Sequence, residues 1–489
     1  MATDSEAVIG LEVHAQLLTR SKMFCSCSAA YLAGEPNSHT CPVCLGLPGA
    51  LPAANRQAID LTIRTALALG CEIPEHSKFD RKNYFYPDLP KGYQISQFDM
   101  PLSLNGHLDI EVEGQRRRVG ITRVHLEEDT GKLIHSGDIH TSTSSLVNLN
   151  RCGVPLMEIV SEPDMRTAAE AREYMQRLRQ LLVWIGVNDG NMEEGSLRCD
   201  ANVSVRPVGQ QELGVKVEVK NMNSFRAVYL ALEHEIERQR VALQKGETIV
   251  QETRGWNEAK GITVGQRSKE FAHDYRYFPE PDLPPLTVTR LMVERARAGL
   301  PELPAARARR FHEDLGLSDY DAAQLTATLE LADYFEEVLS CVGPKNAKEA
   351  ANWVVGEVNR ANKEGEGLSA LSVRPRGLAA LVLRKLDGTL SNNQARELFA
   401  AMAASPEPVT GAAAIDRMIE DRGLRQVTDS SQLAAWVDAA IAAQPQAADD
   451  FRGGNDRAVG RLVGAVMQAS GGKANGPAVS EMLRQKLRG

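Results

Sequence analysis

The chain has 489 residues, of which 43% are hydrophobic and 25% are charged, and its formal net charge is −8 at pH 7. This length suits roughly two to four domains with a core each, and the negative charge excludes a general polycation, so any binding of nucleic acid would depend on local basic patches. Residues 1–6 lack the features of a secretory signal and no stretch is apolar enough to span a bilayer, so we expect a soluble cytoplasmic protein.

Residues 8–17 predict a β-strand in which apolar and polar side chains alternate. Glu12 and His14 lie two residues apart on the polar face and offer two metal ligands side by side. We hypothesise that the first domain is built around this pair. The alternative is an edge strand whose polar face is simply solvated.

Four of the eight cysteines form two closely spaced pairs. Pairs of this kind on short loops favour a closed, tetrahedral zinc site with a structural role, whose ligands would be Cys25, Cys27, Cys41 and Cys44. The alternative is a group of surface thiols that bind no metal. Because disulfides are rare in the cytoplasm, we expect the other cysteines to be buried thiols.

Two blocks, residues 78–99 and 271–278, together hold ten of the 25 aromatic residues of the chain. Basic side chains next to aromatic ones, on segments broken by proline and glycine, are typical of surfaces that stack on bases and contact phosphates. The alternative is local aromatic packing beneath a loop. The candidates for binding substrate or phosphate in these blocks are Lys78, Arg81, Lys82, Tyr84, Tyr86, Tyr275, Arg276 and Tyr277.

Strands are predicted over 108–113, 119–126 and 155–160. The second of these ends in an acidic cluster at 127–129, and the third has Glu158 at its centre. A carboxylate inside a short apolar strand is costly unless it is paired or bound to a metal. The acidic cluster and Glu158 could therefore converge with Glu12 and His14 on one cation. The carboxylates suit Mg²⁺, and the imidazole also allows Mn²⁺.

A capping-box pattern at Thr167 predicts a helix that ends before Gly186, and the residues after it predict an antiparallel hairpin of strands 197–206 and 215–220. One face of the hairpin is polar and of mixed charge. If it lines a cleft rather than facing solvent, its candidates for substrate binding are Arg198, Asp200, Arg206 and Lys220. A lysine-containing phosphate loop and a dinucleotide-binding glycine motif are both absent from the sequence, so ATP would need a different cradle.

From about residue 295 the strand alternation gives way to helical periodicity, and the segment 405–408 marks a second boundary. The fold class we predict is α+β, with a mainly antiparallel-sheet domain over 1–295, an all-α domain over 296–404 and a small α-helical tail domain over 405–489. Residues 456–489 carry six basic and two acidic side chains, which suggests a contact with an RNA backbone. The alternative is a solvated helical face. The tail candidates for tRNA binding are Arg457, Arg461 and Lys473.

Five motifs are long and unusual in composition: IGLEVH (9–14), KFDRKNYFYPD (78–88), GYQISQ (92–97), EEGSLRCDAN (193–202) and DYRYFPEPD (274–282). Through them the chain resembles the B subunit of the tRNA-dependent aspartyl/glutamyl amidotransferase over essentially its whole length. The resemblance implies a cradle-shaped first domain and an ATP-dependent carbon–nitrogen ligase with glutamine as nitrogen donor. Glu-tRNA(Gln) or Asp-tRNA(Asn) would be phosphorylated on its side-chain carboxylate and then amidated.

The resemblance also implies partners and ligands. An amidase-type A subunit would supply ammonia, a small C subunit would complete a heterotrimer, and ATP, Mg²⁺ and structural zinc would be the cofactors. Matched by motif, the catalytic residues that hold Mg²⁺ would be Glu12, His14, Glu128 and Glu158. The alternative function is a non-catalytic zinc scaffold that binds tRNA within the same complex.

Overall fold

The computed structural model describes residues 5–488, except 136–143, 269–273, 363–366 and 428. By its internal contacts the chain divides into two compact units, Met1–Leu303 and Pro304–Gly489. The first unit contains a large sheet with helices and the second consists of helices, so the predicted α+β class is confirmed at this level. In the described residues no helix is long and apolar enough to cross a membrane.

The first unit is built on an eight-stranded sheet. All neighbouring strands are antiparallel except β11 and β12, which are parallel. In spatial order the strands are β13 (Ile262–Ser268), β12 (Glu252–Asn257), β11 (Val217–Met222), β10 (Leu197–Pro207), β1 (Ser5–Gln16), β9 (Pro155–Ser161), β6 (Gln115–Glu128) and β5 (Ser103–Val112). The strand predicted over 8–17 is thus β1, near the middle of the sheet, and the predicted hairpin is the antiparallel pair β10–β11.

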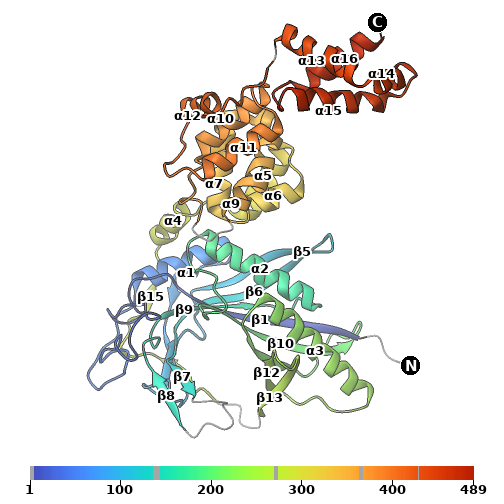
Figure 1. The fold of residues 1–489 in the computed structure, drawn as a ribbon. Coiled ribbons are helices and arrows are strands. Elements are labelled where there is room, and N and C mark those ends of the chain that lie inside the picture. The colour runs from blue at the N-terminus through green and yellow to red at the C-terminus, as the bar shows by residue number, and fades with distance from the viewer. Residues whose placement is uncertain (1–4, 136–143, 269–273, 363–366, 428, 489) are drawn as a thin grey trace. The chain divides into compact units, whose positions relative to one another are not determined.

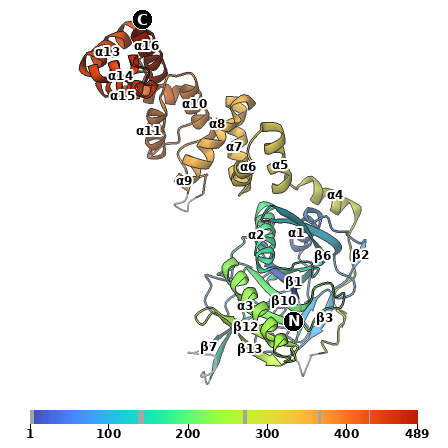
Figure 2. The ribbon, with the colours of Figure 1, turned by 90° about the vertical axis from the view of Figure 1, so that its right-hand side faces the viewer.

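Three helices cover one face of this sheet, namely α1 (Arg56–Ala68), α2 (Ala168–Trp184) and α3 (Phe225–Gln244). Figure 1 shows all three on the same side, and Figure 2 gives a second view of α2 and α3 next to each other. The apolar side chains that alternate along the central strands, such as Leu11, Val13 and Cys199, are buried beneath them. The polar side chains of the same strands therefore lie on the opposite face, because successive residues of a strand point to opposite sides.

Helix α2 begins where the sequence predicts. The Thr167 side chain accepts a hydrogen bond from the Glu170 N–H, as a cap should. The Glu170 carboxylate accepts from the N–H of Arg166 at 2.6 Å rather than from that of Thr167, so the cap differs by one residue from the expected box.

Smaller sheets and one more helix complete the first unit. The short strands form three sheets, and the helix α4 covers Arg290–Ala298. The sheets are β14 (Phe278–Pro279) with β3 (Asp80–Asn83) and β4 (Tyr93–Ser96), β15 (Leu286–Thr287) with β2 (His76–Ser77), and β7 (Lys132–His135) with β8 (Ser145–Asn148).

The second unit is helical, and its last part has a hydrophobic core of its own. The buried residues of this core all come from the segment 433–487. The helices of the unit are α5 (Pro304–Leu315), α6 (Asp319–Leu325), α7 (Leu329–Val342), α8 (Ala347–Trp353), α9 (Asn359–Ala361), α10 (Pro375–Leu386), α11 (Asn392–Ala403), α12 (Ala412–Arg422), α13 (Ser430–Ala443), α14 (Pro445–Arg452), α15 (Val459–Ala469) and α16 (Gly476–Arg488).

Tyr174 of α2 is fully buried, and its hydroxyl has no hydrogen-bond partner among the described residues. A buried polar group without a partner destabilises the folded state by about 1–3 kcal/mol. We expect Tyr174→Phe to raise the free energy of unfolding by about 1 kcal/mol, measured as a higher midpoint in thermal or urea unfolding. Tyr334→Phe is the matched control with the opposite sign, because that buried hydroxyl donates to the Val373 carbonyl oxygen at 2.8 Å. A lower midpoint for Tyr174→Phe would contradict the prediction.

Candidate functional site

The strand register places polar side chains in a row across the sheet face that the helices leave uncovered. His14 of β1 is paired with Arg198 of β10 on one side and with Glu158 of β9 on the other. Glu158 is in turn paired with His125 of β6. Glu127 lies two residues beyond His125 on the same face. The middle of the sheet thus presents a line of acidic and imidazole side chains.

Three of these side chains form a group that could hold one cation. One ligand atom from each of His14, Glu127 and Glu158 lies within 4.8 Å of the others. The Nε2 atom of His14 is 3.6 Å from Glu127 Oε1 and 3.8 Å from Glu158 Oε2. Both carboxylates are buried, with 2% and 8% of their residues' surface exposed. Two buried carboxylates and an imidazole suit Mg²⁺ or Mn²⁺.

The surroundings keep Glu158 ionised. Burial by itself would raise its pKa, but His125, whose Nε2 is 3.1 Å away, and then His14 and Lys82 outweigh burial and hold the pKa below its ordinary value. His125 is a residue that the sequence reasoning missed. Its position two residues before Glu127 on a predicted strand was the signal that could have found it.

The structure separates the two carboxylates at 127 and 128. Strand alternation continues to the end of β6, so Glu127 points into the group while Glu128 points to the other face. Glu128 forms a buried ion pair with Lys91 and accepts the N–H of Ile95 at 3.0 Å. In the described residues the group with His14 and Glu158 thus contains Glu127, whereas Glu128, the residue matched by motif, lies outside it.

Glu12, two residues before His14 on β1, is on the same face, but it lies outside the group of three. Its carboxylate accepts a hydrogen bond from Asn202 Nδ2 at 2.9 Å. Burial, and next the negative charge of Glu158, raise the pKa of Glu12. Glu12 also lines a cavity of about 250 Å³ that reaches Asn202 and Lys216.

The two aromatic blocks, almost 200 residues apart in sequence, lie side by side. Strand β3 pairs with β14, and the rings of Tyr84 and Tyr275 are 6.0 Å apart. Tyr277 stacks on Phe98 with ring centres 4.2 Å apart. Local aromatic packing, the alternative we considered, therefore accounts for part of the pattern. Tyr86 differs, because 57% of its surface is exposed.

Lys82 of β3 brings a positive charge close to the group of three. Its Nζ lies 4.9 Å from the centre of the Tyr275 ring. Burial would lower its pKa, but the negative charge of Glu127, and after it that of Glu158, raises it, so Lys82 is a cation. Among the basic candidates of the first block, Lys82 is the one whose charge acts on the group of three.

Several other candidate cations are occupied by carboxylates of the chain. Lys78 pairs with Asp80 and with Asp99, Arg81 is held by both oxygens of Glu280 at 2.7 and 2.8 Å, and Arg206 pairs with Glu6 at 2.8 Å. These ion pairs are part of the fold.

Other candidates lie closer to the row or on the surface. Arg198 contacts Asp129 at 3.1 Å and stays partly exposed, and Lys220 contacts Asp200 at 2.6 Å. Arg276 is exposed, with φ of 42° and an N–H that donates to Asp274.

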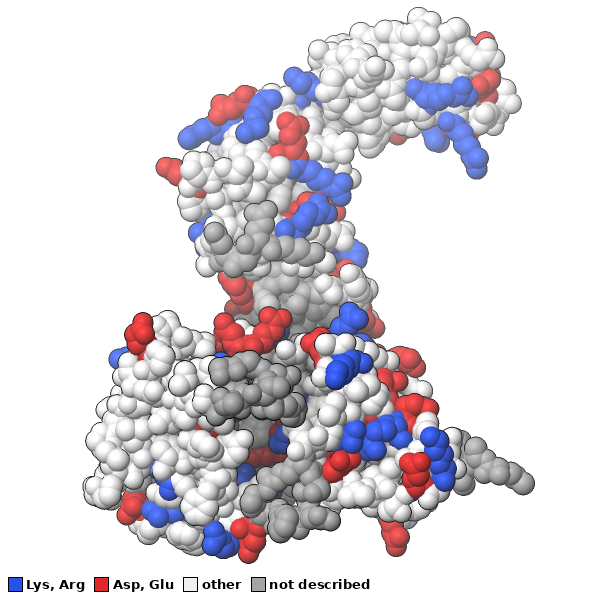
Figure 3. Space-filling view, turned by 60° about the horizontal axis from the view of Figure 1, so that its bottom comes forward, with Lys and Arg blue, Asp and Glu red and all other residues white. Residues whose placement is uncertain are grey.

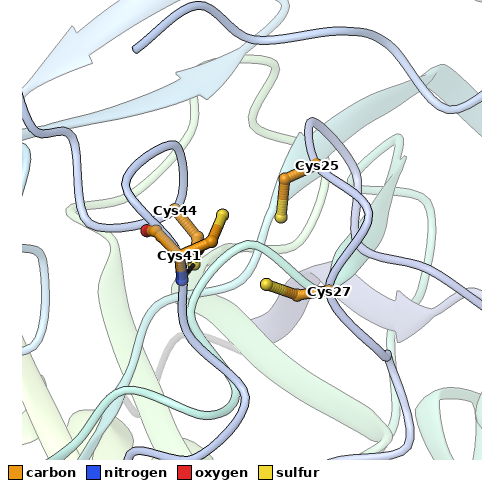
Figure 4. Close-up of side chains that lie close together, drawn as sticks. All are labelled: Cys25, Cys27, Cys41 and Cys44. Atoms are coloured by element: carbon orange, nitrogen blue, oxygen red, sulfur yellow. Dashed lines mark hydrogen bonds between the residues drawn. The ribbon is translucent and has the colours of Figure 1, made fainter.

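The four predicted cysteines converge. Figure 4 shows Cys25 and Cys27 on one loop and Cys41 and Cys44 on another, with their sulfur atoms directed toward a common centre. The four Sγ atoms lie within 4.8 Å of one another. The Cys41 N–H donates to Cys44 Sγ at 3.1 Å, a contact that favours a thiolate. Four convergent sulfur atoms on short loops fit tetrahedral zinc.

The tail candidates Arg457, Arg461 and Lys473 are all exposed. Arg461 contacts Asp450 at 2.9 Å, and further along the tail Lys486 contacts Asp438 at 2.5 Å. In the view of Figure 3, basic and acidic side chains are interspersed over the surface. Any contact of the tail with RNA would thus depend on a few local cations.

Comparison with known proteins gives a consistent result over the whole chain. Residues 7–294 match the model of the GatB/GatE catalytic domain, and residues 333–487 match that of the GatB domain. The B subunit of the aspartyl/glutamyl-tRNA(Asn/Gln) amidotransferase of Carboxydothermus hydrogenoformans is 52% identical over 486 residues, covering 99% of this chain and 98% of the relative. The proteins of the same name from Dehalococcoides mccartyi and Moorella thermoacetica are each 53% identical, over 494 and 483 residues, and cover 99% of both chains. The chain belongs to the family of aspartyl/glutamyl-tRNA(Asn/Gln) amidotransferase B subunits.

Proposed function

We propose that this chain, as the B subunit of the cytoplasmic amidotransferase, activates the side-chain carboxylate of Glu-tRNA(Gln) or Asp-tRNA(Asn) with ATP and then directs ammonia to it. Ammonia would come from an amidase-type A subunit, with a small C subunit as third partner. The observation that carries the proposal is the buried group of His14, Glu127 and Glu158 with Lys82 beside it. Phosphoryl transfer depends on such charged groups at fixed positions more than on covalent chemistry by the protein.

His14, Glu127 and Glu158 would hold Mg²⁺, with His125 fixing the Glu158 carboxylate at 3.1 Å. A bound Mg²⁺ supplies charge neutralisation for the phosphate oxygens during transfer. Lys82 would face those oxygens from the β3 side. Glu12, at the wall of the 250 Å³ cavity, would accept hydrogen bonds from the nucleotide or the aminoacyl group. Tyr84, Tyr275 and Tyr277, whose rings pack together with Tyr275 next to Lys82, would exclude water from the acyl phosphate.

A second candidate function is a non-catalytic scaffold that binds tRNA. The observations that favour it are the convergent cysteine quartet and the exposed aromatic residues Phe85 and Tyr86. A scaffold that only binds tRNA would not require two buried carboxylates in contact with two histidines. The next experiment separates the two functions.

We expect Glu127→Gln in the complete A–B–C complex to lower the release of phosphate from ATP with Glu-tRNA(Gln) by about 100-fold or more, because a preorganised charge is lost where negative charge develops. Glu12→Ala should lower it as well. Glu111→Gln is the matched control, since that carboxylate lies on the exposed edge strand β5 and contacts Arg116. Unchanged phosphate release by Glu127→Gln would favour the scaffold.

We also propose that Cys25, Cys27, Cys41 and Cys44 hold one structural zinc ion. We expect purified Cys41→Ser to contain about one equivalent less zinc than the wild type, because three thiolates bind the ion much less tightly than four. Elemental analysis by mass spectrometry measures this directly. Cys341→Ser should keep the metal, because Cys341 lies far from the quartet in sequence and is exposed, so the expectation of a buried thiol is wrong for this residue. Full zinc content in Cys41→Ser would refute the assignment of the four cysteines.

We further propose that the domains are 1–295, 296–404 and 405–489, and that the third contacts tRNA through Arg457, Arg461 and Lys473. The shared core of residues 433–487 supports a separate tail domain.

Replacing these three tail residues together by alanine should weaken tRNA binding and reduce the slope of log affinity against log salt by about 2–3, since each phosphate contact contributes about 0.7–0.9. Fluorescence anisotropy over a salt series gives both quantities. Arg116→Ala with Arg118→Ala is the control, because both exposed side chains of β6 face carboxylates of the neighbouring strand β5. An unchanged slope would mean that these three side chains are solvated and do not contact the tRNA phosphates.

A further inference from the structure

Lys22 is a lysine with no exposed surface, three residues before the first cysteine of the quartet. Its N–H donates to the Cys27 carbonyl oxygen at 2.9 Å, so its backbone belongs to the first cysteine loop. Its ammonium Nζ donates to the His39 carbonyl oxygen at 2.7 Å and lies 3.8 Å from Cys44 Sγ. Lys22 therefore bridges the two loops that carry the cysteines.

A buried ammonium group is strongly destabilising unless an anion is close to it. In the described part of the chain, the polar contacts of the Lys22 ammonium are a neutral carbonyl and the sulfur of Cys44, with no carboxylate among them. The neighbouring lysine of this region, Lys91, is paired with Glu128 instead. The charge that can compensate Lys22 is therefore that of the cysteine cluster.

The cysteine cluster in turn requires a nearby positive charge. Four thiolates around one Zn²⁺ leave a net charge of −2 in a partly buried place, and such a charge is stabilised by nearby donors and cations. Cys44 is the buried member of the four, and it already accepts the N–H of Cys41 at 3.1 Å. A cation 3.8 Å from the same sulfur completes a set of groups that favours the thiolate at this position.

We propose that Lys22 is the counter-cation of the zinc site and that it determines how tightly the ion is retained through Cys44. This inference rests on the proposed zinc site. Lys22 is a positioning residue: it touches one ligand and not the ion, and it acts by charge rather than by bulk. A side chain with the same length and no charge should fill the space and fail in the role, whereas arginine should retain the charge.

The test compares Lys22→Met and Lys22→Arg in the full-length chain loaded with zinc. Zinc release to an excess of a colorimetric chelator should be about 10-fold to 100-fold faster in Lys22→Met than in the wild type, and close to wild type in Lys22→Arg. In cobalt-substituted protein, the sulfur-to-cobalt charge-transfer band should move to longer wavelength in Lys22→Met alone, because the thiolate becomes more electron-rich. Lys385→Met is the matched control, since it removes a lysine paired with Glu349 in the helical unit.

Each outcome has a separate meaning. Wild-type protein without zinc would refute the zinc site itself, and the Lys22 inference with it. Wild-type protein with one zinc ion, and Lys22→Met with unchanged release and spectrum, would overturn the Lys22 inference alone.

A comparison that needs no lysine variant covers the case in which Lys22→Met fails to fold. Cys44→Ser should lower the melting midpoint more than Cys27→Ser, because only Cys44→Ser leaves the Lys22 ammonium buried without an anion. Equal midpoints would overturn the inference.

Discussion

The charge of two buried carboxylates is the constraint on which this structure depends. Glu127 and Glu158 face each other across neighbouring strands and are almost fully buried. Two negative charges in such a place repel each other and lose their hydration, so they persist only where cations compensate them. Lys82 supplies such a charge from β3, and the imidazoles of His14 and His125 lie against the two carboxylates from β1 and β6. A metal ion at the same point would meet this need most directly.

The strand register is what brings these groups together, and the helices are what fix the register. A shift of one residue in β1 would move His14 beneath α1–α3 and expose Val13, at the cost of an apolar core that is now fully buried. The antiparallel pairing then sets His14 opposite Glu158, and Glu158 opposite His125. The packing on the helical face thus determines which polar side chains meet on the other face.

Much of this arrangement could be predicted from the sequence, because period-two alternation carries both the fold and the polar face. The strands around Glu12 and Glu158, the helix after Thr167 and the cysteine cluster all follow from local patterns. The motif could not decide which of two adjacent glutamates faces His14 and Glu158. Glu127 and Glu128 differ by one position and therefore by a whole face of the sheet.

The ion-pair partners of the predicted phosphate-binding residues could also be found only from the structure. Lys78, Arg81 and Arg206 have the composition of phosphate-binding residues, yet each is held by a carboxylate of the chain. The partner of Arg81 is Glu280, 199 residues further along the chain. Pairings at that separation depend on tertiary structure, and no local pattern contains them. Lys82, next to Arg81 on the same strand, points to the other side and meets the buried carboxylates.

The same alternation links the two proposed metal sites. Glu127 faces the histidines, and its neighbour Glu128 faces Lys91 on the side where the cysteine loops lie. Gly153, with φ of 83°, joins the two sides: its N–H donates to the Asp129 carbonyl oxygen at 2.8 Å, and its carbonyl oxygen accepts from Met23 at 2.7 Å. A Cβ there would be in ordinary van der Waals contact with Cys44 and Lys22, at 3.4 and 3.5 Å, so the positive φ is what favours glycine at this position. Through Gly153 the first cysteine loop is hydrogen-bonded to the segment that directly follows β6, the strand that carries Glu127.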